Sequence, residues 1–300
     1  MAVAHNEPKR EPNPMNTTTA PNPALEPTPR IAPPSAWLQL LEARAPWELA
    51  AGLAMWPWLR FAPRGDGHPV LVLPGLVASD GSTRLLRRFL KGRGYAVHGW
   101  GLGRNYGPRP GIEAAMLARL DKLHADSGRR VSLVGQSLGG GYARALAAQR
   151  PDAVRSVISL GSPITGHPRS SNAWRVYEFT SRQSSHDPKR WQHVTRVLPM
   201  PATSIYSRSD GVVAWQASLG APGPMAENIE VVSSHVGMAV NPTVLFAVAD
   251  RLAQAEGRWQ PFERSGWRRA VYPCGRAALG AREGAGAGAG AGAKALQGNP

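Results

Sequence analysis

A serine lies between two glycines where the hydropathy pattern of the chain changes. The stretch "RVSLVG" (130–135) is typical of a buried strand, and "LGGGYARALAAQR" (138–150) is typical of a helix. Ser137 stands between them, with Gly135 before it and Gly139 after it. A turn of this kind exposes the serine hydroxyl and directs backbone N–H groups to one point beside it, where the helix N-terminus adds partial positive charge. We therefore predict that Ser137 is a nucleophile; the alternative is an idle serine in a glycine-rich bend.

A serine nucleophile needs a base and a carboxylate that orients the base, and both residue types follow later strands. Asp210 lies in "ATSIYSRSDGVV" (202–213), directly after an expected strand. His235 lies in "NIEVVSSHVGM" (228–238), after the next one. The order Ser, acid, His after successive strands favours a triad of Ser137, Asp210 and His235. Read singly, the aspartate would be ordinary turn chemistry and the histidine a surface residue.

Other acidic and histidine residues compete for these roles. Asp80 and Asp187 are alternatives for the acid, and His98, His167 and His193 are alternatives for the base. We expect Asp80 to cap the helix that follows it. His98 precedes the nucleophile within an expected strand, and the other three lie in an irregular segment.

Acyl transfer also requires hydrogen-bond donors for the developing oxyanion. One is expected to be the backbone N–H of Leu138, directly after the nucleophile. The other is expected from the loop after "VLVLP" (70–74), with the N–H of Leu76 preferred and that of Val77 second. Val77 is also an expected substrate contact. The alternative is a plain loop between a strand and a helix.

The elements around these residues predict an α/β fold. From His68 onward, short apolar runs alternate with amphipathic helices, which implies a mainly parallel sheet covered by helices on both faces. The expected strands cover 70–74, 95–100, 130–135, 154–163, 202–207 and 228–232, and the expected helices cover 82–94, 111–128, 138–150 and 241–257.

The motifs, taken in this order, resemble those of the α/β-hydrolase superfamily, in its lipase- and esterase-like branch. The resemblance covers roughly residues 68–256 and rests on "VLVLPGLVASD", "GQSLGG", "SRSDGVV" and "SSHVGM". It implies attack by serine on an acyl carbonyl, an acyl-enzyme intermediate and its release by water or another acceptor. Many lipase-like relatives carry His-Gly where this chain has Pro74-Gly75. We expect a serine ester hydrolase acting on apolar, lipid-like acyl esters; the alternatives are an acyltransferase or thioesterase with the same triad, or a non-enzymatic interaction protein.

The alternation of expected strands and helices is interrupted at residues 163–199, which are expected to form a cap insert. The stretch "AWRVYEFT" (173–180) predicts a short helix that presents Trp174, Tyr177 and Phe179 to substrate, with Trp191 further on. Six basic and two acidic residues lie in the insert. One interpretation is a lid with a basic rim facing an anionic interface; the other is a structural excursion whose aromatic residues are core.

The remaining segments complete the predicted organisation. Residues 1–34 are expected to be a disordered Pro-rich segment, 35–62 a helical segment, 63–257 the hydrolase domain, and 258–300 a basic, Gly/Ala-rich flexible tail. Within 35–59, Ser35 is the expected N-cap, and prolines should interrupt the helix. This segment either packs on the domain or lies at a membrane interface.

Composition limits the partners. The net charge of +15 comes from dispersed basic residues rather than a basic arm, so nucleic-acid binding is not expected, and peripheral contact with an anionic membrane stays an alternative. The chain has one cysteine, Cys274, and no Cys/His spacing typical of a metal site. "GLGRNYG" (101–107) does not fit a dinucleotide fingerprint, so no cofactor is expected. The N-terminus lacks the apolar core of a secretory signal, which favours a cytoplasmic protein with a possible peripheral membrane location.

Overall fold

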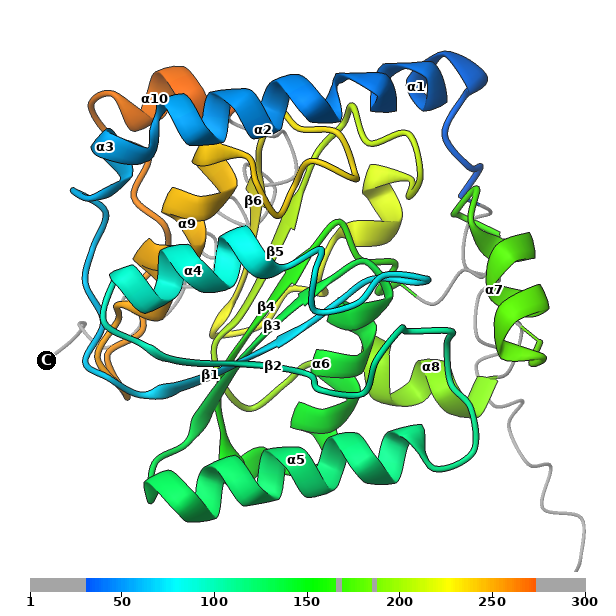
Figure 1. Ribbon diagram of the computed structural model, residues 1–300, viewed down its shortest axis with the longest axis horizontal. Helices are drawn as coiled ribbons and strands as arrows, with labels where there is room; N and C mark the ends of the chain where they lie inside the picture. The colour runs from blue at the N-terminus through cyan, green and yellow to red at the C-terminus, as the bar shows by residue number, and fades with distance from the viewer. Residues whose placement is uncertain (1–30, 166–168, 185–187, 274–300) are drawn as a thin grey trace, which may run out of the picture.

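The computed structural model describes residues 31–165, 169–184 and 188–273 (Figure 1). Most of the predicted N-terminal disordered segment, the tail from Cys274 onward, and two competing residues, His167 and Asp187, lie outside the described residues.

Six parallel strands form one sheet in the order β2-β1-β3-β4-β5-β6. They are β1 (Pro69–Leu73), β2 (Ala96–Gly99), β3 (Val131–Gln136), β4 (Val154–Leu160), β5 (Ala202–Tyr206) and β6 (Ala226–Glu230). The predicted parallel sheet is confirmed. The strand order reverses between β1 and β3, and the crevice at such a switch point is where open α/β sheets bind ligands.

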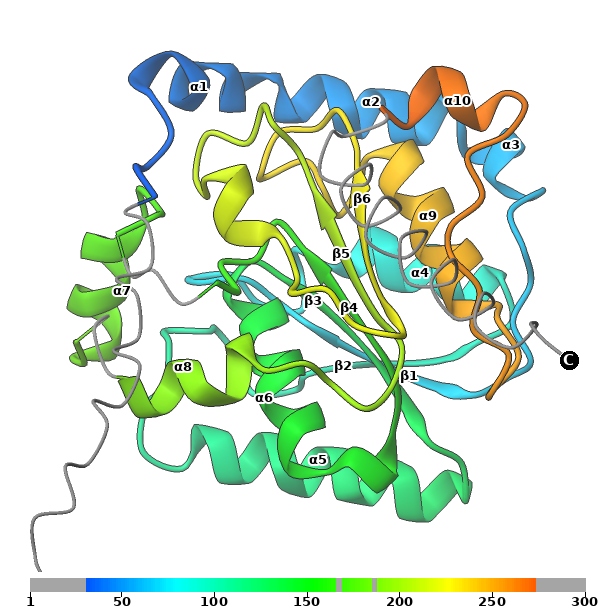
Figure 2. The ribbon, with the colours of Figure 1, turned by 180° about the vertical axis from the view of Figure 1, so that it is seen from behind.

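Helices cover both faces of the sheet (Figures 1 and 2). One face is covered by α4 (Arg84–Gly92) and α9 (Pro242–Leu252), and the other by α5 (Ile112–Ser127) and α6 (Leu138–Gln149). Each helix turns an apolar stripe to the strands, as Met116, Leu120 and Leu123 of α5 do.

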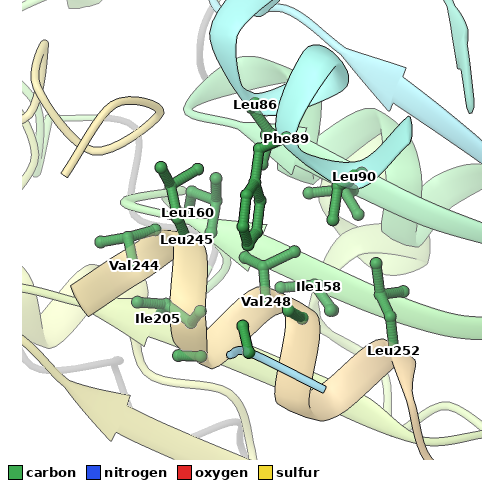
Figure 3. Close-up of a cluster of buried hydrophobic side chains, with 14 of the residues drawn as sticks. Leu86, Phe89, Leu90, Ile158, Leu160, Ile205, Val244, Leu245, Val248 and Leu252 are labelled. Carbon is green, nitrogen blue, oxygen red and sulfur yellow. The ribbon is translucent and has the colours of Figure 1, made fainter. Parts of the chain in front are cut away.

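The core on the α4/α9 side is tightly closed (Figure 3). The side chains of α4 and α9 meet those of β4 and β5 in a single cluster, which includes Phe89, Val248, Ile158 and Ile205, each no more than 3% exposed. These helices fix the strands whose ends carry the candidate site.

The N-terminal segment forms a row of short helices along the top of the molecule in Figure 1. They are α1 (Ala36–Leu40), the 3-10 turn η1 (Leu41–Arg44), α2 (Ala45–Ala54) and α3 (Trp56–Leu59). Ser35 accepts a hydrogen bond from the N–H of Leu38, as predicted. Pro46 and Pro57 each stand in the first turn of a new helix, which their lack of an N–H allows.

The insert contains two short helices, α7 (Trp174–Ser181) and α8 (Pro188–Thr195). The predicted helix over 173–180 is therefore confirmed. The insert is joined to the body by a bridge between Ser171 and Val213. The side chain of Trp191 lies outside the described residues.

Two predicted boundaries are corrected. Residues 258–273 are not part of a flexible tail, as predicted, but of the folded domain. Phe262 and Tyr272 are buried in the core, at 7% and 1% exposed, and residues Arg268–Val271 form the helix α10. At the N-terminal boundary, the carbonyl of Pro34 accepts a hydrogen bond from the Asn172 side chain, so the predicted disordered segment does not extend to residue 34. The flexible tail was overestimated because polar and basic residues between these two aromatics concealed their burial.

The helices described by the structure include none that is long and apolar enough to cross a membrane.

Candidate active site

The turn between β3 and α6 holds Ser137 in a strained conformation. Its φ of 52° is in the region that residues with a side chain rarely adopt. A Cβ atom on Gly135 would lie 2.2 Å from the carbonyl oxygen of Gly139, and one on Gly139 would lie 2.3 Å from that of Leu73. Both flanking glycines are therefore required for the close approach of strand and helix, and the serine is held at the cavity wall described below.

Asp210 and His235 form a buried pair. Asp210, 2% exposed, follows β5, and one carboxylate oxygen lies 2.7 Å from Nδ1 of His235, which follows β6. The other oxygen accepts hydrogen bonds from the N–H groups of Val212 and Val213. The carboxylate is fixed from two sides, so the imidazole carries its proton on Nδ1 and leaves Nε2 available as a base.

The charged surroundings of His235 favour its protonated form. Burial alone would lower the pKa of the imidazole, but the charge of Asp210, its hydrogen bond and the charge of Glu42 together raise the pKa of His235 above its usual value. Coupling to a buried carboxylate is what a triad base requires in order to hold the proton it takes.

Ser137 and His235 both lie at the carboxyl ends of the strands. The side-chain amide of Gln136, the residue before Ser137, donates to the carbonyl of His235 over 3.1 Å. The Ser137 hydroxyl makes no hydrogen bond to any described residue in this structure. A serine–histidine contact that is loose without substrate is common in sites of this kind.

The loop after β1 lies against Ser137. A Cβ atom on Gly75 would lie 3.3 Å from Cβ of Ser137, so the backbone passes close by. Among the described residues, the N–H of Leu76 has no acceptor, and that of Leu138 stands in the first turn of α6, where no helix carbonyl reaches it. Leu76 and Leu138 both line the cavity with Ser137, which is consistent with the predicted oxyanion donors.

Val77 is corrected as an oxyanion donor and as a substrate contact. Its N–H donates to the carbonyl of Asn105 over 2.6 Å, and its side chain is not on the cavity wall. Sequence reasoning missed Asn105, which is fully buried and donates to the carbonyl of Pro74. It anchors the loop after β1. The only signal was an asparagine in the glycine-rich stretch 101–107.

A cavity of about 350 Å³ opens beside Ser137. This is the size range of small-ligand sites. Its walls are mostly apolar and come from α5, α6, α7 and α8; they include Met116, Tyr142, Leu146, Trp174, Tyr177 and Val194. Trp174 and Tyr177 therefore lie where the sequence placed them. Phe179 does not, because its side chain is 86% exposed and absent from the wall. It lies two residues after Tyr177 in α7, about 200° around the helix, and therefore on the opposite side.

The described competitors have other positions. Asp80 does not cap α4: its carboxylate accepts from the N–H groups of Trp100 and Gly101, after β2. His98 lies within β2, and His193 lines the cavity from α8 without a carboxylate partner shown among the described residues. Among the histidines that the structure describes, only His235 pairs with Asp210.

A second Ser–His–Asp set lies at the opposite end of the strands, near the amino ends of β1 and β3. His68 contacts Asp66 over 2.6 Å and Ser132 over 2.9 Å. Ser132 and His68 are both fully buried, and Asp66 also pairs with Arg155. Burial keeps the pKa of His68 below its usual value, and no substrate can reach Ser132. We interpret this set as a structural link between β1, β3 and β4.

The described residues include no group of three or more His, Cys, Asp or Glu side chains that could hold a metal ion.

Comparisons with known proteins agree with this architecture. A family model described as the alpha/beta hydrolase fold matches residues 113–192, which include β3, the Ser137 turn and α6. The chain has the α/β-hydrolase fold. No curated protein sequence matches this chain.

Several solved structures are similar to this chain at low identity. Aspergillus fumigatus lipase B is 16% identical with a TM-score of 0.51, over 65% of this chain and 54% of the lipase; this chain thus spans about half of that protein. An α/β superfamily hydrolase from Oenococcus oeni PSU-1 is 20% identical with a TM-score of 0.46, over 62% of this chain and 91% of the other. Mouse alpha/beta hydrolase domain-containing protein 10 is 18% identical with a TM-score of 0.47, over 63% and 90%.

Proposed function

We propose that this α/β-hydrolase is a serine ester hydrolase for apolar acyl esters. The observation that carries the proposal is the buried Asp210–His235 pair, at 2.7 Å, at the same sheet edge as a strained serine on a cavity wall. A buried carboxylate that contacts Nδ1 of a histidine serves a base, because it favours the imidazolium that forms during catalysis.

The proposed chemistry has two halves. Nε2 of His235 takes the hydroxyl proton of Ser137 while Oγ bonds to the ester carbonyl carbon, and the N–H groups of Leu76 and Leu138 stabilise the oxyanion. The same histidine then gives the proton to the leaving alcohol, which leaves an acyl-serine. Water, deprotonated by His235, then attacks the acyl carbon. The bond to Oγ of Ser137 breaks, Oγ takes the proton back from His235, and the acid is released.

The apolar cavity supports an acyl chain as the recognised part of the substrate. Aromatic and aliphatic side chains dominate its walls, and burying a methylene group there is worth about 0.8 kcal/mol. Transfer of the acyl group to an alcohol or thiol acceptor, or hydrolysis of a thioester, uses the same residues and is the alternative. The acceptor decides between them.

The test is a series of p-nitrophenyl esters from acetate to laurate, with the full-length protein and Ser137→Ala. We expect kcat/KM to rise from acetate toward the medium-length chains and to vanish in the variant. A protein that turns over none of these esters, nor the matching acyl thioesters, would overturn the proposal. Added alcohol that diverts most product to the transferred ester would instead identify an acyltransferase.

A further inference from the structure

The N-terminal helices have their charged side chains on the inside. Residues 36–59 contain three charged residues, Glu42, Arg44 and Glu48. All three are half-buried and bond to the loops after β5 and β6. An ordinary surface helix turns its charged face to water, and this segment does the reverse.

The opposite face of these helices is apolar and exposed. We call it the outer face; it carries Trp37, Leu40, Trp47, Leu53, Trp58 and Phe61, each between 54% and 77% exposed. Single exposed apolar residues are normal, but a run of large ones with three tryptophans and no charge among them between 36 and 59 marks an interaction surface.

Basic residues border the outer face. Arg60 and Arg64 follow α3, and both are exposed. α10 lies beside α2 and α3 in both views, and it brings an exposed Trp267 and an exposed Arg269 (Figures 1 and 2). Among the described residues, none of these three arginines has an ion-pair partner. The border is therefore positively charged and free to meet an anionic surface.

We propose that the outer face docks on an anionic lipid bilayer, with the helices lying in the plane of the interface. Tryptophan side chains at the level of the headgroups, an apolar face beneath them and arginines at the rim are the composition of interfacial helices. The bordering arginines favour an anionic bilayer over a neutral protein partner. Anionic headgroups cover the whole bilayer surface, so each arginine can pair with one of them. This docking does not depend on the hydrolase activity.

The experiment is vesicle sedimentation of the full-length protein and two variants. Phosphatidylcholine vesicles are compared with vesicles that also contain phosphatidylglycerol, at low and high salt. We expect binding to the anionic vesicles that weakens with salt, and a loss of at least about tenfold in Trp47→Ser/Trp58→Ser. Phe179→Ser, an equally exposed aromatic outside the outer face, is the matched control and should bind within about twofold of wild type.

Three results would overturn the docking proposal. One is no binding to either vesicle. Another is equal binding by wild type and the double variant, and a third is loss of binding in Phe179→Ser instead. If sedimentation equilibrium finds a dimer that the double variant abolishes, while vesicles bind neither protein, the outer face is an interface between two copies. Unchanged thermal unfolding of the variants shows that they fold.

A separate observation concerns the inner face of the same helices. One carboxylate oxygen of Glu42 accepts from the N–H groups of Gly211 (2.8 Å) and His235 (2.9 Å), and the other accepts from Val236 (3.0 Å). Gly211 follows the acid, so a single side chain bonds both loops of the Asp210–His235 pair.

Two neighbours extend this contact. Glu48 accepts from the N–H of Ser234 and from the hydroxyl of Ser233, and Arg44 donates to the carbonyl of Ser209. Arg44 and Glu48 also pair with each other. The fit is close, since a Cβ atom on Gly237 would lie 2.0 Å from the Glu48 carboxylate.

We infer that Glu42 is a positioning residue that holds the acid loop and the base loop in register. This inference rests on the proposed hydrolase function. The Glu42 carboxylate accepts hydrogen bonds from three backbone N–H groups, and a neutral side-chain oxygen would accept them more weakly than a charged one. The charged groups that act on His235 are Asp210 from the loop after β5 and Glu42 from η1, with the Arg44–Glu48 pair beside them.

The test compares Glu42→Ala and Glu42→Gln with wild type on a soluble ester. We expect Glu42→Ala to lower kcat by at least about tenfold with KM within about threefold, because the base is misplaced rather than substrate binding lost. Glu42→Gln keeps an acceptor oxygen and should recover part of kcat, while the inflection of the pH profile moves to lower pH because a negative charge is lost.

The two failures are distinguishable. If wild type is active and Ser137→Ala is not, but Glu42→Ala keeps wild-type kcat, the positioning role is wrong and the proposed function stands. A pH profile of Glu42→Gln that does not shift would also contradict the inferred role of Glu42. If Ser137→Ala is as active as wild type, the proposed function itself fails.

Discussion

At the scale of single residues, the strain at Ser137 is the feature that points to chemistry. A non-glycine residue at positive φ costs about 1–3 kcal/mol, which the surrounding glycines and the hydrogen bond from its N–H to the carbonyl of Leu160 must offset. A serine without a role would not require this conformation, since a glycine would adopt it freely.

Substitutions in the proposed triad should separate chemistry from folding. We expect Ser137→Ala and His235→Ala to lower kcat by about 10⁴-fold or more, and Asp210→Asn to lower it by about 10²–10⁴-fold, because the acid orients the base rather than reacting. Ester hydrolysis assays with thermal unfolding measure both effects. Ser132→Ala, in the second Ser–His–Asp set, is the control and should keep wild-type kcat; a loss there as large as in Ser137→Ala would reverse the assignment.

The pH dependence follows from the surroundings of His235. Its pKa is raised, so the neutral imidazole that serves as base forms only at higher pH than for a free histidine. We expect kcat/KM to rise with pH through an inflection above about 6.5. A profile that is flat between about pH 5 and 9, or that inflects clearly below 6, would count against His235 as the base.

At this scale the sequence predicted well what depends on order along the chain. Asp210 and His235 follow successive strands, and the structure brings them into contact. It could not reveal that the N–H of Val77 is taken by Asn105, or that Glu42 reaches the base loop 193 residues away, because such contacts depend on how distant loops meet. The catalytic roles themselves stay predictions.

At the scale of elements, α7 decides which part of the insert contacts substrate. Trp174 and Tyr177 face the cavity, and Phe179 faces outward. The sequence predicted the helix correctly, but the apolar spacing over eight residues did not fix which side faces inward, because all three aromatics suit a buried face.

A pair of substitutions on α7 tests this arrangement. We expect Trp174→Ser to lower kcat/KM for long-chain esters more than for acetate, since it removes apolar wall that only a long chain contacts. Phe179→Ser should change neither. Kinetics on the ester series measures this; equal losses on short and long esters in Trp174→Ser would mean that Trp174 is structural core.

At the scale of the whole molecule, the chain after α9 completes the fold. Tyr272 is 1% exposed and its hydroxyl donates to the carbonyl of Thr243, and Phe262 packs against its ring. The sequence predicted the sheet and its helices because their periodicity is strong. It missed this closing segment because two aromatics among polar residues carry no periodicity.

We expect residues up to 273 to be required for stability and the residues after 273 to be dispensable for it. Ending the chain after Pro273 should leave thermal unfolding and ester hydrolysis near wild type. Tyr272→Ala should lower the free energy of unfolding by about 3–5 kcal/mol, because it opens a cavity and removes the hydrogen bond to the carbonyl of Thr243. Denaturant unfolding measures both, and a Tyr272→Ala protein as stable as wild type would show that this segment does not hold the core.

The most direct test of the proposed function is covalent labelling with a fluorophosphonate probe, read by peptide mass spectrometry. Ser137 should carry the adduct, because an activated serine attacks phosphorus as it attacks an acyl carbon. Heat-denatured protein and His235→Ala should label far more slowly. No adduct at Ser137 in the folded protein, or an adduct on another serine that persists in Ser137→Ala, would contradict the assignment of this site.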